Sequence, residues 1–184
     1  MNTLCRLVVL VAFGIVANQV LLAQTKNASH KTPAQTETSA REEASTTSVR
    51  TYVLRLKPGQ DLRAELERFA KSKALQAGYI ITCAGSLQKA SLRLADKSDS
   101  TNYAGKFEIV SLVGTLSPDG PHLHISLSDG DGKTIGGHLV AGCEIYTTAE
   151  IVIGDAQGLK MTREQDSQSG YKELKVRRKS AMRR

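Results

Sequence analysis

The segment that decides the fold is Pro121–Val140, PHLHISLSDGDGKTIGGHLV. Apolar and polar residues alternate on both sides of residues 129–132. These four residues are Asp-Gly-Asp-Gly, a sequence typical of the turn in a β-hairpin. We therefore expect two antiparallel strands, 123–127 and 134–141, joined by a tight turn. A turn centred on Gly130 and Asp131 places His138 opposite Leu123 or His124.

One helix is expected before this hairpin. Asp61 is a suitable N-cap, apolar residues recur at helical spacing as far as Ala74, and Gly78 ends the pattern. The other periodic segments resemble strands, at 50–56, 79–84, 90–95, 107–116 and 144–153. The pattern predicts an α+β fold, with a mainly antiparallel sheet of about six or seven strands and one principal helix packed on it.

The chain of 184 residues is expected to hold one domain behind an export signal. Arg6, an apolar run from Leu7 to Val16 and Ala23 before a polar stretch are typical of a signal peptide over 1–23. We assign 24–48 as a flexible linker, 49–155 as the domain and 156–184 as a C-terminal extension with a basic tail. The predicted location is periplasmic or secreted, with no integral membrane domain after cleavage. An uncleaved anchor is the alternative.

The net charge of +7 lies mostly at the C-terminus. Residues 49–171 carry fourteen groups of each sign, whereas 172–184 carry seven basic residues and one Glu. Such a tail has two interpretations: either it is a solvent-exposed end of the chain, or it binds the phosphates of a nucleic acid. Candidates for the second reading are Lys175, Arg177, Arg178 and Lys179. DNA is not the expected partner, because exported proteins seldom meet chromosomal DNA and no stacking aromatic residues accompany the tail.

Three of the four histidines fall on the predicted hairpin. His122 and His124 are two residues apart and share a strand face, and His138 returns beside them. Three neutral imidazoles suit zinc or another divalent transition metal and leave one coordination position open. The alternative is the polar face of an exposed strand, with no metal. Gly136 and Gly137 are typical of a close backbone approach or of a bulge.

Two carboxylates and two thiols are further candidates. Glu108 and Glu144 lie in apolar strand contexts. Each is therefore either a ligand, a residue that supports the ligands or a base near the metal, or else a member of a structural pair. Cys83 and Cys143 remain after signal removal, either as a disulfide or as two buried thiols.

The domain resembles the PPC domain, named for its conservation in plants and prokaryotes. The resemblance covers Val49–Asp155 and rests on GKFEIVSLVGT at 105–115, HLHISL at 122–127, GGHL at 136–139 and Gly142-Cys143. The opening strand, PGQD at 58–61 and GSL at 85–87 are also similar. No Arg-Gly-Arg-Pro element of the plant AT-hook is present, so the chain resembles a bacterial exported type.

The resemblance implies a twisted sheet with a helix packed on it, a homotrimer, and metal binding at positions matching His122, His124 and His138. We therefore expect an exported homotrimeric binding module with a three-histidine metal site and an unknown small ligand. Two alternatives stay open: a metal-dependent hydrolase that uses Glu108 or Glu144 as base, and the DNA-binding role that the family label suggests.

Overall fold

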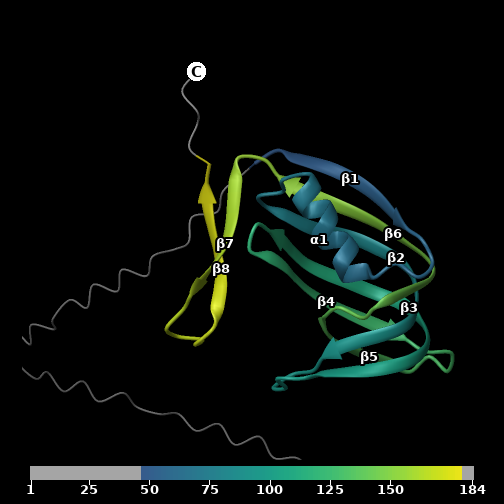
Figure 1. Cartoon of the computed structure of the whole chain (residues 1–184). Coiled ribbons are helices and arrows are strands. Elements are labelled where there is room, and N and C mark those ends of the chain that lie inside the picture. Colours follow the sequence, from purple (N-terminus) through teal and green to yellow (C-terminus); the bar gives the residue numbers. More distant parts are fainter. Residues whose placement is uncertain (1–46, 180–184) are drawn as a thin grey trace, which may run out of the picture. The chain divides into compact units, whose positions relative to one another are not determined.

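The computed structural model describes residues 47–179, so the predicted signal peptide and most of the predicted linker lie outside the described residues. Eight strands and one helix form this part of the chain (Figure 1). In chain order the elements are β1 Val49–Leu56, α1 Leu62–Ser72, β2 Gly78–Arg93, β3 Ser100–Ser117, β4 Gly120–Ser128, β5 Thr134–Leu139, β6 Glu144–Ala156, β7 Leu159–Gln165 and β8 Lys172–Arg178. The α+β prediction is confirmed.

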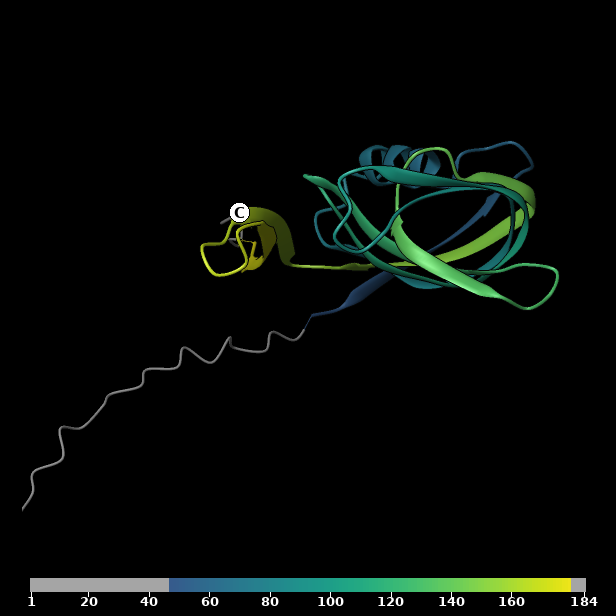
Figure 2. The same ribbon diagram turned by 90° about the horizontal axis from the view of Figure 1, so that it is seen from below.

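Six strands form one antiparallel sheet in the order β1-β6-β2-β3-β4-β5, and this sheet curls until its last strand meets β2 again (Figure 2). The closing contact pairs Leu92 with Leu139 and Arg93 with His138. Gly137 allows it, because a Cβ there would lie 2.9 Å from the Arg93 carbonyl oxygen. The close approach expected at this glycine is therefore made by the backbone of β2.

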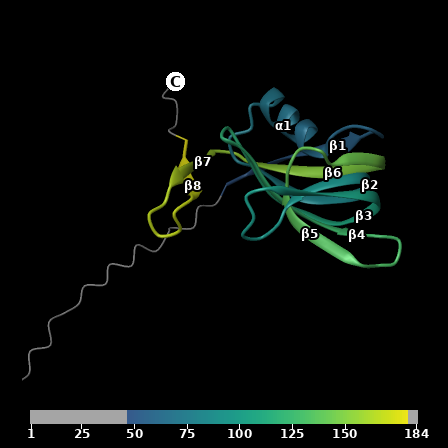
Figure 3. The ribbon, with the colours of Figure 1, turned by 60° about the horizontal axis from the view of Figure 1, so that its bottom comes forward.

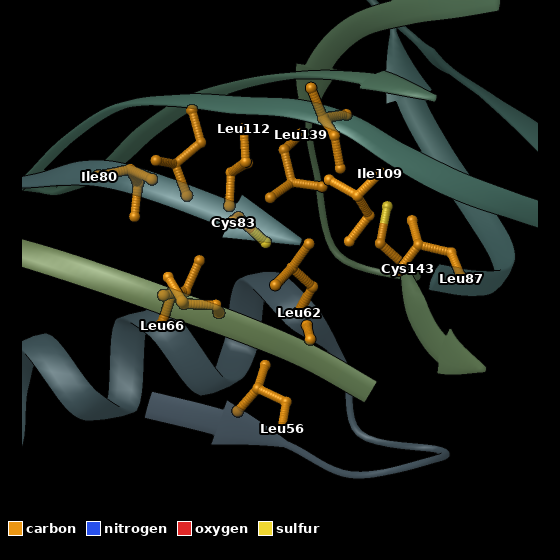
Figure 4. Close-up of a cluster of buried hydrophobic side chains, with 14 of the residues drawn as sticks. Leu56, Leu62, Leu66, Ile80, Cys83, Leu87, Ile109, Leu112, Leu139 and Cys143 are labelled. Atoms are coloured by element: carbon orange, nitrogen blue, oxygen red, sulfur yellow. The ribbon is translucent and has the colours of Figure 1, made fainter. Parts of the chain in front are cut away.

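Helix α1 lies across one face of the sheet (Figure 3). Asp61 caps it, since its carboxylate accepts a hydrogen bond from the Ala64 N–H at 2.8 Å. The same carboxylate accepts from the Gly142 N–H at 2.6 Å, which ties the helix start to the segment between β5 and β6. Leu62 and Leu66 are fully buried in the core beneath the helix (Figure 4). Burying two such leucines contributes about 3 kcal/mol or more to folding.

Two expectations about strands are corrected by the structure. The segments 79–84 and 90–95 belong to one strand, β2, whose register shifts where the sheet bends. The basic segment is also not a solvated tail throughout, because Lys172–Arg178 forms β8 and pairs with β7. Leu174 and Val176 alternate there with charged residues. With only two apolar residues among five charged ones, this pattern is too weak to predict a strand from the sequence.

Both cysteines of the described region are buried free thiols, and each lies in the core (Figure 4). The Cys143 thiol accepts a hydrogen bond from the Ser91 N–H at 3.2 Å and donates one to the Ser91 carbonyl at 3.3 Å. Burial raises the pKa of each thiol to about 11, so both are protonated and unreactive at neutral pH.

The one helix in the described part of the chain lacks the length and apolar character needed to cross a membrane.

Candidate metal site on the hairpin

The three predicted histidines converge on one side of the hairpin. His124 on β4 pairs directly with His138 on β5, so one of the two predicted registers is confirmed. His122 lies two residues earlier on β4 and therefore points to the same side. The ring centroids are 5.2 Å apart for His122 and His124, 5.1 Å for His122 and His138, and 5.4 Å for His124 and His138.

This arrangement suits a transition metal. One ring nitrogen from each histidine lies within 4.8 Å of the other two, which is compatible with three ligands around one ion. The Nδ1 atom of His138 is buried and has no hydrogen-bond partner among the described residues. A buried polar atom without a partner is costly, and coordination of a metal is one way to satisfy it. A bound ion would supply a Lewis acid here, and the three imidazoles would hold it.

The surroundings keep two of the imidazoles neutral. Burial, which has the larger effect, and the positive charge of Arg93 together lower the pKa of His138 to about 4. Burial and the adjacent Arg163 also lower the pKa of His122. Only a neutral imidazole has a lone pair to offer a metal, so this environment favours ligation at neutral pH.

In the metal-free protein, we expect the free energy of unfolding to fall on acidification from about pH 7 to about pH 5. Both histidines have a lower pKa in the folded chain than the ordinary value of 6.5, so the unfolded chain binds more protons as the pH falls below that value. Urea unfolding of a His138→Gln variant should show a shallower dependence over this range. If the free energy of unfolding depends on pH equally in the variant and the wild type, the buried His138 does not contribute to the pH dependence as expected.

A hollow of about 400 Å³ opens beside His122 and His138. Its other walls come from β2 and from the β7–β8 hairpin. The lining residues besides the two histidines are Arg93, Pro121, Arg163, Tyr171, Lys172 and Glu173. Arg163 also contacts the Nδ1 atom of His122 directly. Arg93, Arg163 and Glu173 were not predicted as site residues, because strand pairing and the position of the β7–β8 hairpin bring them to the histidines from distant parts of the sequence.

The other predicted site residues lie elsewhere. Glu108 on β3 sits between Ser86 and Ser128 in the sheet, and Glu144 forms an ion pair with Lys89 at 3.8 Å. Neither carboxylate lines the hollow at the histidines. Of the basic candidates, Arg177 pairs with Glu164 at 2.8 Å. Lys175, Arg178 and Lys179 are exposed on β8 or just after it.

The fold and the site together define a class of protein that has a curled antiparallel sheet, one helix and a group of three histidines. The family model described as the Plants and Prokaryotes Conserved (PCC) domain matches residues 43–157, more than half of the chain. The chain therefore belongs to this family, also abbreviated PPC, as its sequence predicted.

Two solved structures and one curated protein are similar to the chain. A hypothetical protein from Salmonella cholerae-suis has 40% identity and a TM-score of 0.72, and the match covers 74% of this chain and 99% of that one. A metal-containing protein from Archaeoglobus fulgidus has 27% identity and a TM-score of 0.61, with coverage of 72% and 99%. The bifunctional protein GlmU of Synechococcus sp. (strain JA-3-3Ab) is 50% identical over 131 residues, which are 71% of this chain and 21% of GlmU.

The chain spans about a fifth of the length of the first curated relatives that it matches. The domain is thus also found as part of a much longer protein.

Proposed function

We propose that the protein is an exported, homotrimeric binding module that presents a metal ion to a small ligand. The metal would be zinc or another divalent transition ion, held by His122, His124 and His138. The observation that carries this proposal is the convergence of three imidazoles from two neighbouring strands. The metal-containing relative from Archaeoglobus fulgidus supports it. Three protein ligands leave a position open, so a ligand can coordinate without displacing a side chain.

Self-association of the chain, which the homotrimer requires, is supported by exposed apolar side chains on β1, β2 and β3. Val53 of β1 is 79% exposed, and Val152 of β6 pairs with it in the register. Ile81 on β2, and Val110 and Val113 on β3, are also large exposed side chains. Exposed apolar side chains on neighbouring strands are common where subunits meet.

We expect light scattering of the mature protein to give three times the mass of the chain, and metal analysis of the same sample to give one ion per chain. A Val110→Asp variant should shift toward the monomer mass, because it buries an unpaired carboxylate at the proposed interface. Val176→Asp on β8 serves as the control and should keep the wild-type mass. A monomeric wild type, or a wild type without metal when zinc is supplied, would contradict the proposal.

A metal-dependent hydrolase is the second candidate function. It is favoured by one observation: Glu173 lines the hollow together with His122 and His138. A carboxylate beside an open metal position is suited to act as general base for a bound water. The residues that fit this role are therefore the three histidines and Glu173, rather than Glu108 or Glu144.

DNA is not part of the proposed function. Glu173 and Leu174 separate Lys172 from Lys175 on β8, and Arg177 is already paired with Glu164. The ion pair reduces the positive charge that this strand can offer to a phosphate backbone. Export, which the N-terminal sequence predicts, would also separate the protein from chromosomal DNA.

A further inference from the structure

Positive groups from several elements surround the three-histidine group. Arg93 on β2, Arg163 on β7 and Lys172 on β8 line the hollow itself. Arg63 on α1 lies beside it, donating hydrogen bonds to the Leu139 carbonyl at 3.1 Å and the Pro121 carbonyl at 3.4 Å. None of these four cations has an acidic partner within ion-pair distance in residues 47–179.

Arg163 is held in place from more than one side. Its backbone N–H donates to the Asp119 carboxylate at 2.7 Å, and its guanidinium donates to the Lys172 carbonyl at 3.2 Å. A planar guanidinium held in this way offers donors in a fixed fork, which matches the oxygens of a phosphate or carboxylate group.

The charges at the site do not balance without a further anion. Three neutral imidazoles contribute no negative charge, and a divalent ion adds two positive charges to those of Arg93, Arg163 and Lys172. Glu173 is the one carboxylate among the residues that line the hollow. Positive potential in a partly closed hollow draws small anions and strengthens their binding.

We propose that the ligand of this site is a small oxyanion, with phosphate or carboxylate oxygens, bound between Arg93 and Arg163 next to the metal. This inference rests on the proposed function, since it gives the open metal position an occupant. The metal and the guanidinium groups would share the oxygens of one ligand. The β7–β8 hairpin, which begins after the residues matched by the family model, thereby supplies part of the specificity.

The test uses the full mature protein, loaded with metal, in four forms: wild type, Arg93→Met, Arg163→Met and the control Arg68→Met. Arg68 is an exposed residue of α1 outside the hollow, so its replacement removes the same charge elsewhere. Inorganic phosphate and acetate are titrated separately by calorimetry at constant ionic strength set with chloride. The metal content and thermal unfolding of each form are measured on the same samples.

We expect the wild type to bind either phosphate or acetate. Arg68→Met should bind the same probe with the same affinity as the wild type. Each of the two hollow variants should bind it at least about tenfold more weakly, as expected for the loss of a charge-assisted hydrogen bond. The preferred probe identifies the ligand as a phosphate or a carboxylate. Metal-loaded wild type that binds neither probe, or equal binding by all four forms, would overturn this inference and leave the metal site standing. A wild type that takes up no metal would instead overturn the proposed function.

Discussion

Replacement of His138 by alanine is expected to lower the affinity for zinc by at least about 100-fold, because loss of a direct ligand should exceed the 10- to 100-fold cost of losing an outer partner. His138 pairs with His124 across the hairpin, and its Nδ1 atom is the buried atom without a hydrogen-bond partner. Two remaining imidazoles form a much poorer site for an ion that prefers four ligands. Equilibrium titration of metal-free protein against a competing chelator measures the effect.

The fourth histidine of the chain offers a matched control. His30 lies outside the described residues, in the segment predicted to be a linker, so His30→Ala should bind zinc as the wild type does. Comparable affinities for His138→Ala and His30→Ala would show that the three-histidine group is not the metal site.

Replacement of Gly114 by alanine is expected to destabilise the protein by about 2 kcal/mol or more. Gly114 has φ +134°, and a Cβ there would lie 2.0 Å from the His122 carbonyl oxygen. Because the added Cβ would collide with the backbone, β3 and β4 would have to move apart at His122. The same change should therefore weaken zinc binding as well. Urea unfolding and the chelator titration give the two measurements.

Gly130 in the hairpin turn is the control for this variant. A Cβ at Gly130 would meet no atom within 4 Å, so Gly130→Ala should change the free energy of unfolding by no more than about 0.5 kcal/mol. If Gly114→Ala unfolds at the same urea concentration as Gly130→Ala, the close packing of β3 on β4 does not constrain the site in the way described.

The local parts of the site were predictable from the sequence. The Asp-Gly-Asp-Gly turn predicts the hairpin and limits the residue opposite His138 to Leu123 or His124, and in the structure it is His124. Asp61 was predictable as a helix cap because its side chain acts within one turn of the chain. In each case the residues that decide the contact are close together in sequence.

The charged residues around the histidines were not predictable in the same way. Arg93 reaches His138 because β5 closes onto β2, and Arg163 reaches His122 because the β7–β8 hairpin docks there. Both contacts depend on how distant strands pair, which hydrophobic alternation does not specify. The alternation marked Glu108 and Glu144 as lying on apolar strands, yet it does not tell which residues face them across the sheet.

X-ray absorption at the metal edge of the zinc-loaded wild type tests the central claim most directly. The account predicts three imidazole nitrogens around each zinc, at about 2.0–2.1 Å, with the remaining position taken by an oxygen ligand. Zinc bound through sulfur, or with fewer than three imidazole nitrogens, would contradict it.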